Sequence, residues 1–393
     1  MFASRTNWQL EPNRLAQALE AHSRGGNKLL DLTASNPTTC GFSYPEHEIL
    51  AALADRRALE YRPESKGSPE ARAAIRAYYR GRRGFSDSAR DIDPERVLLT
   101  SSTSEAYAYV FRLLCEAGDE VLVPAPSYPL FEFLAGLADI RLVPYPLLYD
   151  HGWQIDLGAL RAGLTPRSRA VLVVHPNNPT GSFVKPREAA ELAALCARRE
   201  MAIVADEVFL DYVAGAASPA TFAFHEGALT FTLSGLSKIA ALPQMKLSWL
   251  VVSGPEILAQ QSIDRLEIIA DTYLSPSIPV QLATPKFLCL RGQLQTQLRE
   301  RIAVNLACLD QALGGSSPLT RLEREGGWYA VLRVPASGPD DALAVELLER
   351  WSVFVHPGQF FNFSQDGYLV LSLITPAAEF QEGLRRLQKF FGA

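Results

Sequence analysis

Between residues 97 and 206 the sequence repeats one unit: a short apolar run, a loop rich in small and polar residues, and a helix-like segment. The apolar runs are at 97–100, 120–123, 141–145, 170–174 and 202–205. This alternation predicts strands of a mostly parallel sheet, with connecting helices on both faces. Ligands of such sheets bind at the carboxyl ends of the strands. The residues that follow each apolar run are therefore the first candidates for a functional site.

Elsewhere the alternation stops. Helices are predicted at 8–22, 47–58 and 255–271, a further helix is predicted from Pro69 onward with Ser68 as its cap, and a long helix is predicted over 282–313. Strand-like runs at 326–335, 353–360 and 367–376 are accompanied by helical patterns at 340–351 and 377–390. We expect an α/β fold: a large domain (46–285) with a mostly parallel seven-stranded sheet flanked by helices, and a smaller α+β domain. The N-terminal segment (1–45) and the C-terminal part (286–393) would form the smaller domain.

Composition limits the classes of function. The 393 residues are 48% hydrophobic and carry a formal net charge of −5, which is typical of a globular protein and gives no electrostatic case for binding nucleic acid. The five cysteines are scattered, with no CxxC pair and no His/Cys cluster. This pattern predicts reduced thiols, a cytoplasmic protein and no metal site. A signal peptide and an apolar run of membrane-spanning length are not recognised, so no membrane partner is expected.

One lysine occupies an unusual position. Lys238 lies between two apolar runs, 230–233 and 247–252, beside Ser234, Gly235 and Ser237. Loss of solvation lowers the pKa of a lysine and makes its amine a nucleophile towards carbonyl groups. A Schiff-base lysine is one interpretation, and an ordinary lysine of a surface loop is the other.

Small and turn-forming residues follow two of the predicted strands. The segment TSSTSEA, which starts at Thr100, opens a helix, and its backbone N–H groups suit a phosphate, although a plain helix cap would have the same composition. The segment HPNNPTG ends another strand, where Asn178 can direct its amide at a ligand oxygen or simply belong to a turn.

A carboxylate and an aromatic residue follow two further strands. Asp206, in IVADEVF, comes directly after an apolar run, and a secluded carboxylate needs a partner. A protonated ring nitrogen would serve, as would a helix cap or a structural ion pair. Tyr128, in PAPSYP, can stack on a flat ligand or pack in the core.

The order of these features is more specific than any one of them. A phosphate turn, an aromatic residue, Asn178, Asp206 and then Ser-x-x-Ser-Lys238 follow one another, with 28 residues from Asn178 to Asp206 and 32 from Asp206 to Lys238. This arrangement resembles the class I/II aminotransferases, fold-type I enzymes that bind pyridoxal 5′-phosphate. The resemblance extends from Asn36 and Pro37 to the last predicted strand.

The resemblance implies roles for the residues at matching positions. Lys238 would form the internal aldimine and shuttle the α-proton of the substrate, and Asp206 would keep the pyridine nitrogen protonated. Asn178 would donate to the ring 3′-oxygen and Tyr128 would stack on the ring.

Further positions correspond to the phosphate site of the family. The groups implied to hold the phosphate belong to Ser102, Thr103, Ser237 and Lys246. Tyr61 matches the tyrosine that reaches the phosphate of the neighbouring subunit, so the resemblance also implies a homodimer with shared active sites.

Three positions depart from the family pattern. Lys246 stands where arginine is usual, and Phe209 replaces a tyrosine that supports the 3′-oxygen. Val370 replaces the arginine that binds the substrate carboxylate, a charge-assisted contact worth about 1.5–3 kcal/mol. Arg333 is the nearest candidate to replace it, unless strand alternation turns its side chain away.

The resulting hypothesis is an aminotransferase that exchanges an amino group between a small-molecule amino donor and a 2-oxo acid by a ping-pong mechanism. Val370 keeps an alternative open, another enzyme of fold-type I such as a β-lyase, a decarboxylase or an amine-directed enzyme. A ligand-sensing regulator and a catalytically silent relative are further alternatives. Five aromatic residues line a substrate pocket or belong to the core: Phe42, Tyr44, Trp328, Phe360 and Phe361.

Overall fold

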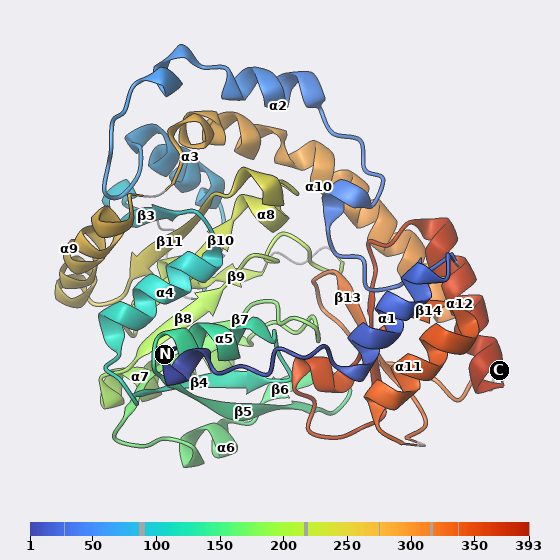
Figure 1. The fold of residues 1–393 in the computed structure, drawn as a ribbon. Helices are drawn as coiled ribbons and strands as arrows, with labels where there is room; N and C mark the ends of the chain where they lie inside the picture. The colour runs from blue at the N-terminus through green and yellow to red at the C-terminus, as the bar shows by residue number, and fades with distance from the viewer. Residues whose placement is uncertain are drawn as a thin grey trace.

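The computed structural model describes residues 1–26, 28–85, 91–215, 219–274, 276–314, 317–336 and 338–392. Its centre is a sheet that has, in the described ranges, eight strands in the order β3-β11-β10-β8-β7-β4-β5-β6. Their bounds are β3 Val97–Thr100, β4 Glu120–Ala125, β5 Arg141–Tyr149, β6 Trp153–Ile155, β7 Ser168–Val174, β8 Ala202–Asp206, β10 Thr230–Gly235 and β11 Ser248–Ser253. Figure 1 shows this sheet with helices on both sides. The predicted α/β fold class is confirmed.

The strand directions agree with a mostly parallel sheet. β5, β4, β7, β8 and β10 run parallel to one another, whereas β11 is antiparallel to both of its neighbours, β10 and β3. The prediction of seven strands missed β6, which folds back on β5 as a short antiparallel partner. Gly152 (φ 141°) in the connecting turn takes a backbone conformation that a residue with a side chain rarely adopts.

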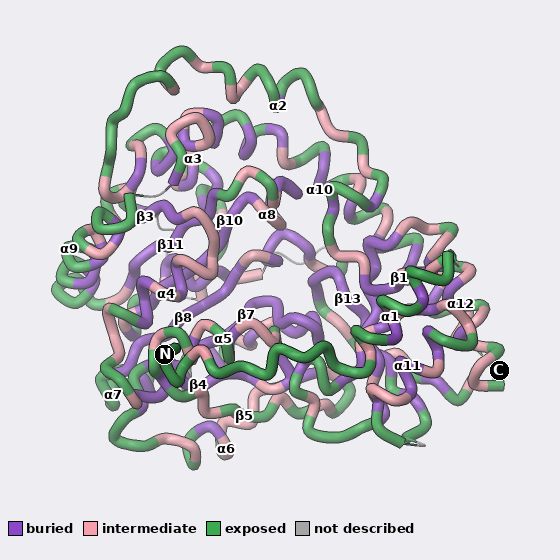
Figure 2. Tube along the Cα trace, viewed as in Figure 1, coloured by how far each residue is buried: buried purple, intermediate pink, exposed green. Residues whose placement is uncertain are grey.

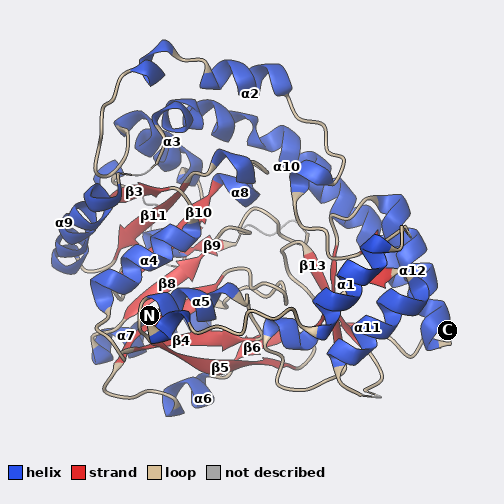
Figure 3. Ribbon diagram, viewed as in Figure 1, coloured by secondary structure: helices blue, strands red, loops and turns tan. Residues whose placement is uncertain are grey.

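Helices bury both faces of the large sheet. One face packs against α4 (Thr103–Leu114), α5 (Leu130–Leu137) and α9 (Glu256–Tyr273), and the opposite face against α6 (Leu157–Ala162) and α7 (Pro186–Arg199). Near β3 and β11, the core is completed by α3 (Pro69–Tyr79) and the start of α10 (Ile278–Ala312). Figures 2 and 3 show the strands as the buried middle layer and α2 (Glu46–Leu53) as a largely exposed helix at the rim.

A smaller sheet forms beside the large one. Its order is β12-β13-β16-β15, and the strands are β12 Thr320–Arg321, β13 Tyr329–Arg333, β15 His356–Pro357 and β16 Tyr368–Ser372. It packs with α11 (Asp340–Trp351) and α12 (Ala377–Phe391), while α1 (Arg14–Arg24) lies on α11. The N-terminal segment runs past α5 to this region (Figure 1), where β1 (Leu30–Asp31) pairs with β14 (Val353–Phe354). The division at 45/46 and 285/286 stays a prediction, and α10 continues unbroken across the second boundary.

Two predicted helices near the N-terminus have different bounds. The helix expected at 8–22 begins at Arg14, because the Asn13 side chain accepts a hydrogen bond from the backbone N–H of Ala16 and caps it there. The helix expected at 47–58 ends at Leu53 and is followed by a 3-10 turn, Arg56–Leu59. The Ser68 cap is confirmed, with its Oγ accepting from the backbone N–H of Ala71 over 3.3 Å.

Two short strands that the sequence reading missed, β2 (Arg83–Gly84) and β9 (Ala220–Thr221), pair in parallel. A search of the helices in the described part of the chain finds none with the length and apolar character needed to cross a membrane.

Candidate active site

The residues predicted from the strand ends come from neighbouring strands of the large sheet. Asp206 is the last residue of β8, and Lys238 lies on the short helix α8 (Leu236–Ile239) that directly follows β10. β10 and β8 are paired, with Leu233 opposite Asp206. Asn178 follows β7 on the other side of β8. The parallel pairing of the strands therefore brings these three side chains to one edge of the sheet.

Lys238 is held by a close approach of two strands. A Cβ atom at Gly235 would lie 2.2 Å from Oγ of Ser248 on β11, so the turn before Lys238 has no room for a side chain. The backbone carbonyl of Lys238 accepts a hydrogen bond from Tyr212 Oη over 2.7 Å. These contacts fix the backbone from which the amine extends.

The amine of Lys238 lies among aromatic rings. Its Nζ is 4.9 Å from the ring centroid of Trp328 and 5.6 Å from that of Phe209. Burial lowers the pKa of Lys238 to about 8, and the nearby groups of Asp206 and Cys40 oppose this shift. A large part of the amine is therefore neutral, and able to act as a nucleophile, near pH 8.

Asp206 is a buried carboxylate, and in the described part of the chain it forms no ion pair within 4 Å. Its Oδ2 accepts a hydrogen bond from Tyr107 Oη over 2.8 Å, and its Oδ1 accepts one from the backbone N–H of Val208 over 3.1 Å. Burial raises the pKa of Asp206, while both hydrogen bonds and the charge of Lys238 lower it. Both donors are neutral, so the carboxylate can still accept a cationic partner.

Asn178 lies in a turn that is held by its neighbour. Asn177 Oδ1 accepts from Thr180 Oγ1 over 3.0 Å, and its Nδ2 donates to Ser127 Oγ over 3.4 Å. Asn178 is 8% exposed, and its Oδ1 has no hydrogen-bond partner among the described residues. The turn therefore leaves the Asn178 amide available to a ligand.

Tyr128 is not packed into the core. It is 43% exposed and touches Phe131 edge to face, with ring centroids 6.0 Å apart. The loop before it is tied to the smaller sheet, because Ser127 donates its N–H to the carbonyl of Phe361 over 2.8 Å. One face of the Tyr128 ring can stack on a flat molecule.

The turn after β3 is a capped helix start. Ser102 is the N-cap of α4, where its Oγ accepts from the backbone N–H of Glu105 over 3.1 Å, and Thr103 is the first helical residue. Glu105 Oε2 accepts from the N–H and the hydroxyl of Ser101, at 2.7 and 3.0 Å. The Ser102 oxygen therefore serves as the acceptor in the helix cap. Its hydroxyl hydrogen can still be donated to an anion.

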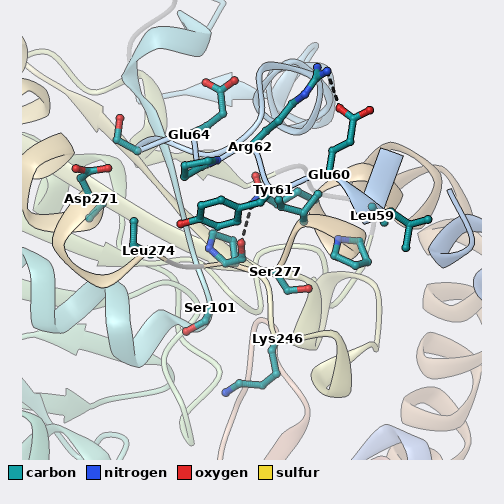
Figure 4. A pocket seen from close by; sticks show the side chains of 18 residues that line it. Leu59, Glu60, Tyr61, Arg62, Glu64, Ser101, Lys246, Asp271, Leu274 and Ser277 are labelled. Atoms are coloured by element: carbon teal, nitrogen blue, oxygen red, sulfur yellow. Dashed lines mark hydrogen bonds and ion pairs between the residues drawn. The ribbon is translucent and has the colours of Figure 1, made fainter. Parts of the chain in front are cut away.

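A cavity of about 500 Å³ joins Lys246 to Tyr61. Figure 4 shows Tyr61 in the middle of this cavity, with Ser101 and Lys246 below it and Leu274 to its left. Tyr61 is 73% exposed, and Lys246 forms no ion pair within 4 Å in the described ranges. Ser237, the remaining predicted phosphate residue, is half-buried on α8 directly before Lys238.

Val370 and Arg333 lie on the same face of the smaller sheet. Val370 is fully buried and paired with Val331, and Arg333 is paired with Tyr368 two positions further on. Alternation therefore does not turn Arg333 away. Its guanidinium nevertheless points to the rings of Tyr149 and Tyr368 and lines a cavity that Lys238, Asp206, Asn178 and Tyr128 do not line. The structure does not bring Arg333 to Lys238.

The five aromatic candidates for a substrate pocket divide into two groups. Trp328 and Phe361 are buried, and Phe42 and Tyr44 pack against the same core cluster. Phe360 is 45% exposed and stacks on His356 with centroids 4.6 Å apart. Trp328 is the member of this group whose ring contacts the Lys238 amine.

Sequence reasoning missed Tyr107 and Tyr212. Tyr107 lies on α4 and Tyr212 lies in the segment after β8, and both are almost completely buried. Each looks like a core residue in the sequence, because nothing in the pattern shows which polar atom its hydroxyl will reach.

Comparison with known proteins supports the resemblance found in the sequence. The family model of aminotransferase class I and II matches residues 27–387. The chain is 31% identical over 259 residues to glutamate-pyruvate aminotransferase AlaA of Escherichia coli strain K12, an alignment that covers 66% of this chain and 63% of that protein. It is 27% identical over 389 residues to alanine aminotransferase of Mycobacterium tuberculosis, covering 95% and 87% of the two chains.

Solved structures show the same fold. A crystal structure of an aminotransferase from Escherichia coli superposes with a TM-score of 0.85 at 25% identity, covering 100% of this chain and 98% of that one. Alanine aminotransferase from Pyrococcus furiosus superposes with a TM-score of 0.89 at 22% identity, with both chains covered completely, and at this identity it shows the fold alone. The names of the two curated relatives and of the Escherichia coli structure favour transamination over lyase or decarboxylase chemistry. Because the family model matches most of its length, the chain belongs to the class I and II aminotransferases.

Proposed function

We propose that this chain is an aminotransferase that moves an amino group from a small-molecule amino donor to a 2-oxo acid with pyridoxal 5′-phosphate at Lys238. The observation that carries the proposal is a half-buried lysine, whose pKa is lowered to about 8, at the end of the strand that pairs with β8, which ends in the buried carboxylate of Asp206. Class I and II aminotransferases depend on this cofactor. The named relatives indicate alanine and glutamate as the first amino donors to test, with pyruvate as the first acceptor.

The side chains of this site fit the cofactor ring. Asp206 has only neutral donors, Tyr107 and the N–H of Val208, so a protonated ring nitrogen would complete its hydrogen bonding. The Nδ2 group of Asn178 could donate a hydrogen bond to a ring oxygen, and the exposed face of Tyr128 fits the ring itself. The cofactor supplies an electron sink that makes the Cα–H of the bound substrate acidic.

The chain supplies the groups that hold and move protons. Asp206 keeps a proton at the ring nitrogen, where its negative charge stabilises the cationic form. The Lys238 amine, neutral in large part near pH 8, would accept the proton from Cα of the bound substrate, whose electron pair the cofactor takes up, and would deliver that proton to the cofactor carbon that carries the amino nitrogen. The rings of Trp328 and Phe209 flank this amine, and Tyr212 fixes the backbone of Lys238.

Four residues are proposed to hold the phosphate. They are Ser102 and Thr103 at the start of α4, Ser237 on α8, and Lys246. The start of α4 offers backbone N–H groups and the positive end of the helix dipole, and Lys246 adds a charge without an ion-pair partner in the described ranges. Lysine binds the phosphate as a point charge, without the two parallel hydrogen bonds that arginine forms.

The chain is further proposed to form a homodimer with shared active sites. Tyr61 is exposed in the cavity that contains Lys246, and the apolar side chains of Leu59 and Leu274 beside it are 88% and 60% exposed. Exposed apolar side chains gathered in this way favour a protein partner. The five free cysteines of the described residues favour a reducing compartment, and the cytoplasm is the proposed location.

A mixing experiment tests the shared site. We expect Lys238→Ala and Tyr61→Ala each to have little activity alone. Refolded together, they would form hybrid dimers in which one site has both side chains intact, and activity would return to about a quarter of the wild-type value. A mixture no more active than its components would contradict a site shared between subunits.

The reaction itself is tested by single-turnover spectroscopy. Alanine or glutamate added to the cofactor-loaded protein is expected to convert the absorbance of the aldehyde form to that of the amine form, and pyruvate is expected to reverse it. Release of ammonia with pyruvate, or of carbon dioxide, would identify a lyase or a decarboxylase and reject the proposal.

A further inference from the structure

A second cavity, of about 550 Å³, lies where the large sheet meets the smaller one. Its walls come from β5 and β6 of the large sheet on one side and from β13, β16 and the loop before β16 on the other. Its volume is within the range of sites that bind small organic molecules. Lys238, Asp206, Asn178 and Tyr128 do not line it, so it is distinct from the site described above.

Arg333 provides the positive charge of this cavity. Its guanidinium carbon is 5.8 Å from the ring centroid of Tyr149 and 6.0 Å from that of Tyr368. In the described ranges no carboxylate lies within 4 Å of this guanidinium. A guanidinium placed between two aromatic rings keeps its edge free for the two parallel hydrogen bonds that a carboxylate accepts.

The remaining wall is a run of aromatic side chains. Tyr149 meets Trp153 edge to face at 5.1 Å, Trp153 meets Phe363 at 6.3 Å, and Phe363 stacks on Tyr368 at 4.6 Å. Leu148 adds an apolar surface that is 52% exposed. These rings offer faces and edges to a flat apolar body.

Trp153 belongs to this aromatic wall and is only 5% exposed. Its indole Nε1 has no hydrogen-bond partner among the described residues and almost no accessible surface, so a bound molecule is expected to contact the ring and not the N–H.

The geometry points to a binding site for an organic monocarboxylate with a flat apolar body, bound by Arg333 and the rings of Tyr149 and Tyr368. The carboxylate of Glu132 also lines the cavity. It would repel a second negative charge, and this favours a monoanion over a dicarboxylate or a phosphate ester. Because both sheets line the cavity, a bound molecule would hold them together and stabilise the fold.

The test uses 1-naphthaleneacetate as probe, with its uncharged amide as a matched compound. Isothermal titration calorimetry is expected to show one saturable site per chain, for wild type and for Lys238→Ala alike, and tighter binding of the carboxylate than of the amide. Arg333→Gln is expected to weaken binding of the carboxylate by about 10-fold or more and to leave binding of the amide unchanged. The probe is also expected to raise the melting temperature of the wild type.

Two control variants complete the experiment. Arg198→Gln removes the same charge from the exposed end of α7 and is expected to bind like wild type. Arg333→Lys keeps the charge without the planar guanidinium and is expected to bind between wild type and Arg333→Gln, which distinguishes a lost ligand contact from a misfolded variant. Equal binding of the probe by Arg333→Gln and wild type would overturn the proposal. Loss of binding in Lys238→Ala would assign the probe to the cofactor site and would overturn it too, without bearing on transamination.

Discussion

Tyr107 donates a hydrogen bond from its Oη to Oδ2 of Asp206 over 2.8 Å, and both side chains are buried. The bond joins α4, whose first turn is the proposed phosphate site, to the end of β8, which carries the proposed partner of the ring nitrogen. It stabilises the charged form of Asp206 and so opposes the rise in pKa that burial causes. Tyr107 is therefore a positioning residue that also keeps the carboxylate ionised.

Replacement of Tyr107 by phenylalanine tests this role. Tyr107→Phe is expected to raise the pKa of Asp206, because burial then acts with one opposing hydrogen bond fewer. The acid limb of the pH profile of kcat would move to higher pH, and kcat at neutral pH would fall by about 10-fold, the value of one lost hydrogen bond to a charged group.

Tyr145→Phe is the matched control. It removes another buried tyrosine hydroxyl, which donates to the carbonyl of Leu172 over 2.7 Å. We expect a comparable loss of stability with the acid limb in its original place. An acid limb that stays unchanged in Tyr107→Phe as well would remove Tyr107 from the account.

Gly235 gives a prediction about the backbone before Lys238. Its φ of −179° is extended, so the reason for glycine is steric: a Cβ would lie 2.2 Å from Ser248 Oγ and 3.0 Å from the Cα of Ser248. Gly235→Ala is expected to lower the free energy of unfolding by about 1–3 kcal/mol and to reduce kcat by displacing Lys238. Gly292→Ala, on α10 with nothing within 4 Å, is expected to be neutral or stabilising by about 0.5–1 kcal/mol. The free energy of unfolding of both variants is measured with a denaturant. Equal values for Gly235→Ala and Gly292→Ala would contradict this account.

The buried side chain of His175 is expected to make the stability of the fold depend on pH. It is buried beneath the turn that carries Asn178, its Nδ1 accepts from the N–H of Val184, and its Nε2 is 2.9 Å from the carbonyl of Ala220. Burial lowers the pKa of His175 to about 4 from an ordinary value of 6.5. Between these pH values the unfolded chain binds the proton and the folded chain does not, so stability is lost as pH falls from 6.5 towards 4. The loss from this group reaches about 3 kcal/mol.

The measurement for His175 is the pH slope of the free energy of unfolding. His175→Gln is expected to be less stable at pH 7, because its hydrogen bonds are altered, and to lose less stability than wild type between pH 6.5 and 4.5. His151→Gln, which replaces an exposed histidine, is the control and is expected to show the same pH slope as wild type. A slope in His175→Gln as steep as that of wild type would show that His175 does not titrate in this way.

The lowered pKa of Lys238 predicts how the apoprotein reacts. Trinitrobenzenesulfonate modifies neutral amines, so its rate of reaction with Lys238, followed by peptide mass, is expected to reach half its maximum near pH 8. A rate that still rises steeply above pH 9.5 would indicate a lysine with an ordinary pKa and would contradict the role of burial.

Much of the fold could be predicted from the sequence, because buried parallel strands are apolar runs that turn residues separate. β3, β7, β8 and β10 were found in this way. The short strand β6 was missed, since three residues after a turn give no periodic signal. The start of α1 depends on one hydrogen bond, from the backbone N–H of Ala16 to the side chain of Asn13. Other polar residues nearby could also have capped the helix, so the sequence did not show where it begins.

The candidate site divides along similar lines. Asp206, Lys238 and Asn178 could be found because they follow strands that a parallel sheet brings together. Tyr107 and Tyr212 could not, because their function depends on which backbone or carboxylate oxygen a buried hydroxyl meets after packing. Arg333 shows a third case: the strand register puts it on the face of Val370, but the rings of Tyr149 and Tyr368 decide where its side chain lies.

The most direct test is the covalent attachment of pyridoxal 5′-phosphate. Purified protein incubated with the cofactor, reduced with borohydride and digested is expected to carry one cofactor per chain, on the peptide that contains Lys238. Lys238→Ala is expected to carry none and to have no transaminase activity. Label on another lysine, or full turnover by Lys238→Ala, would contradict the central claim.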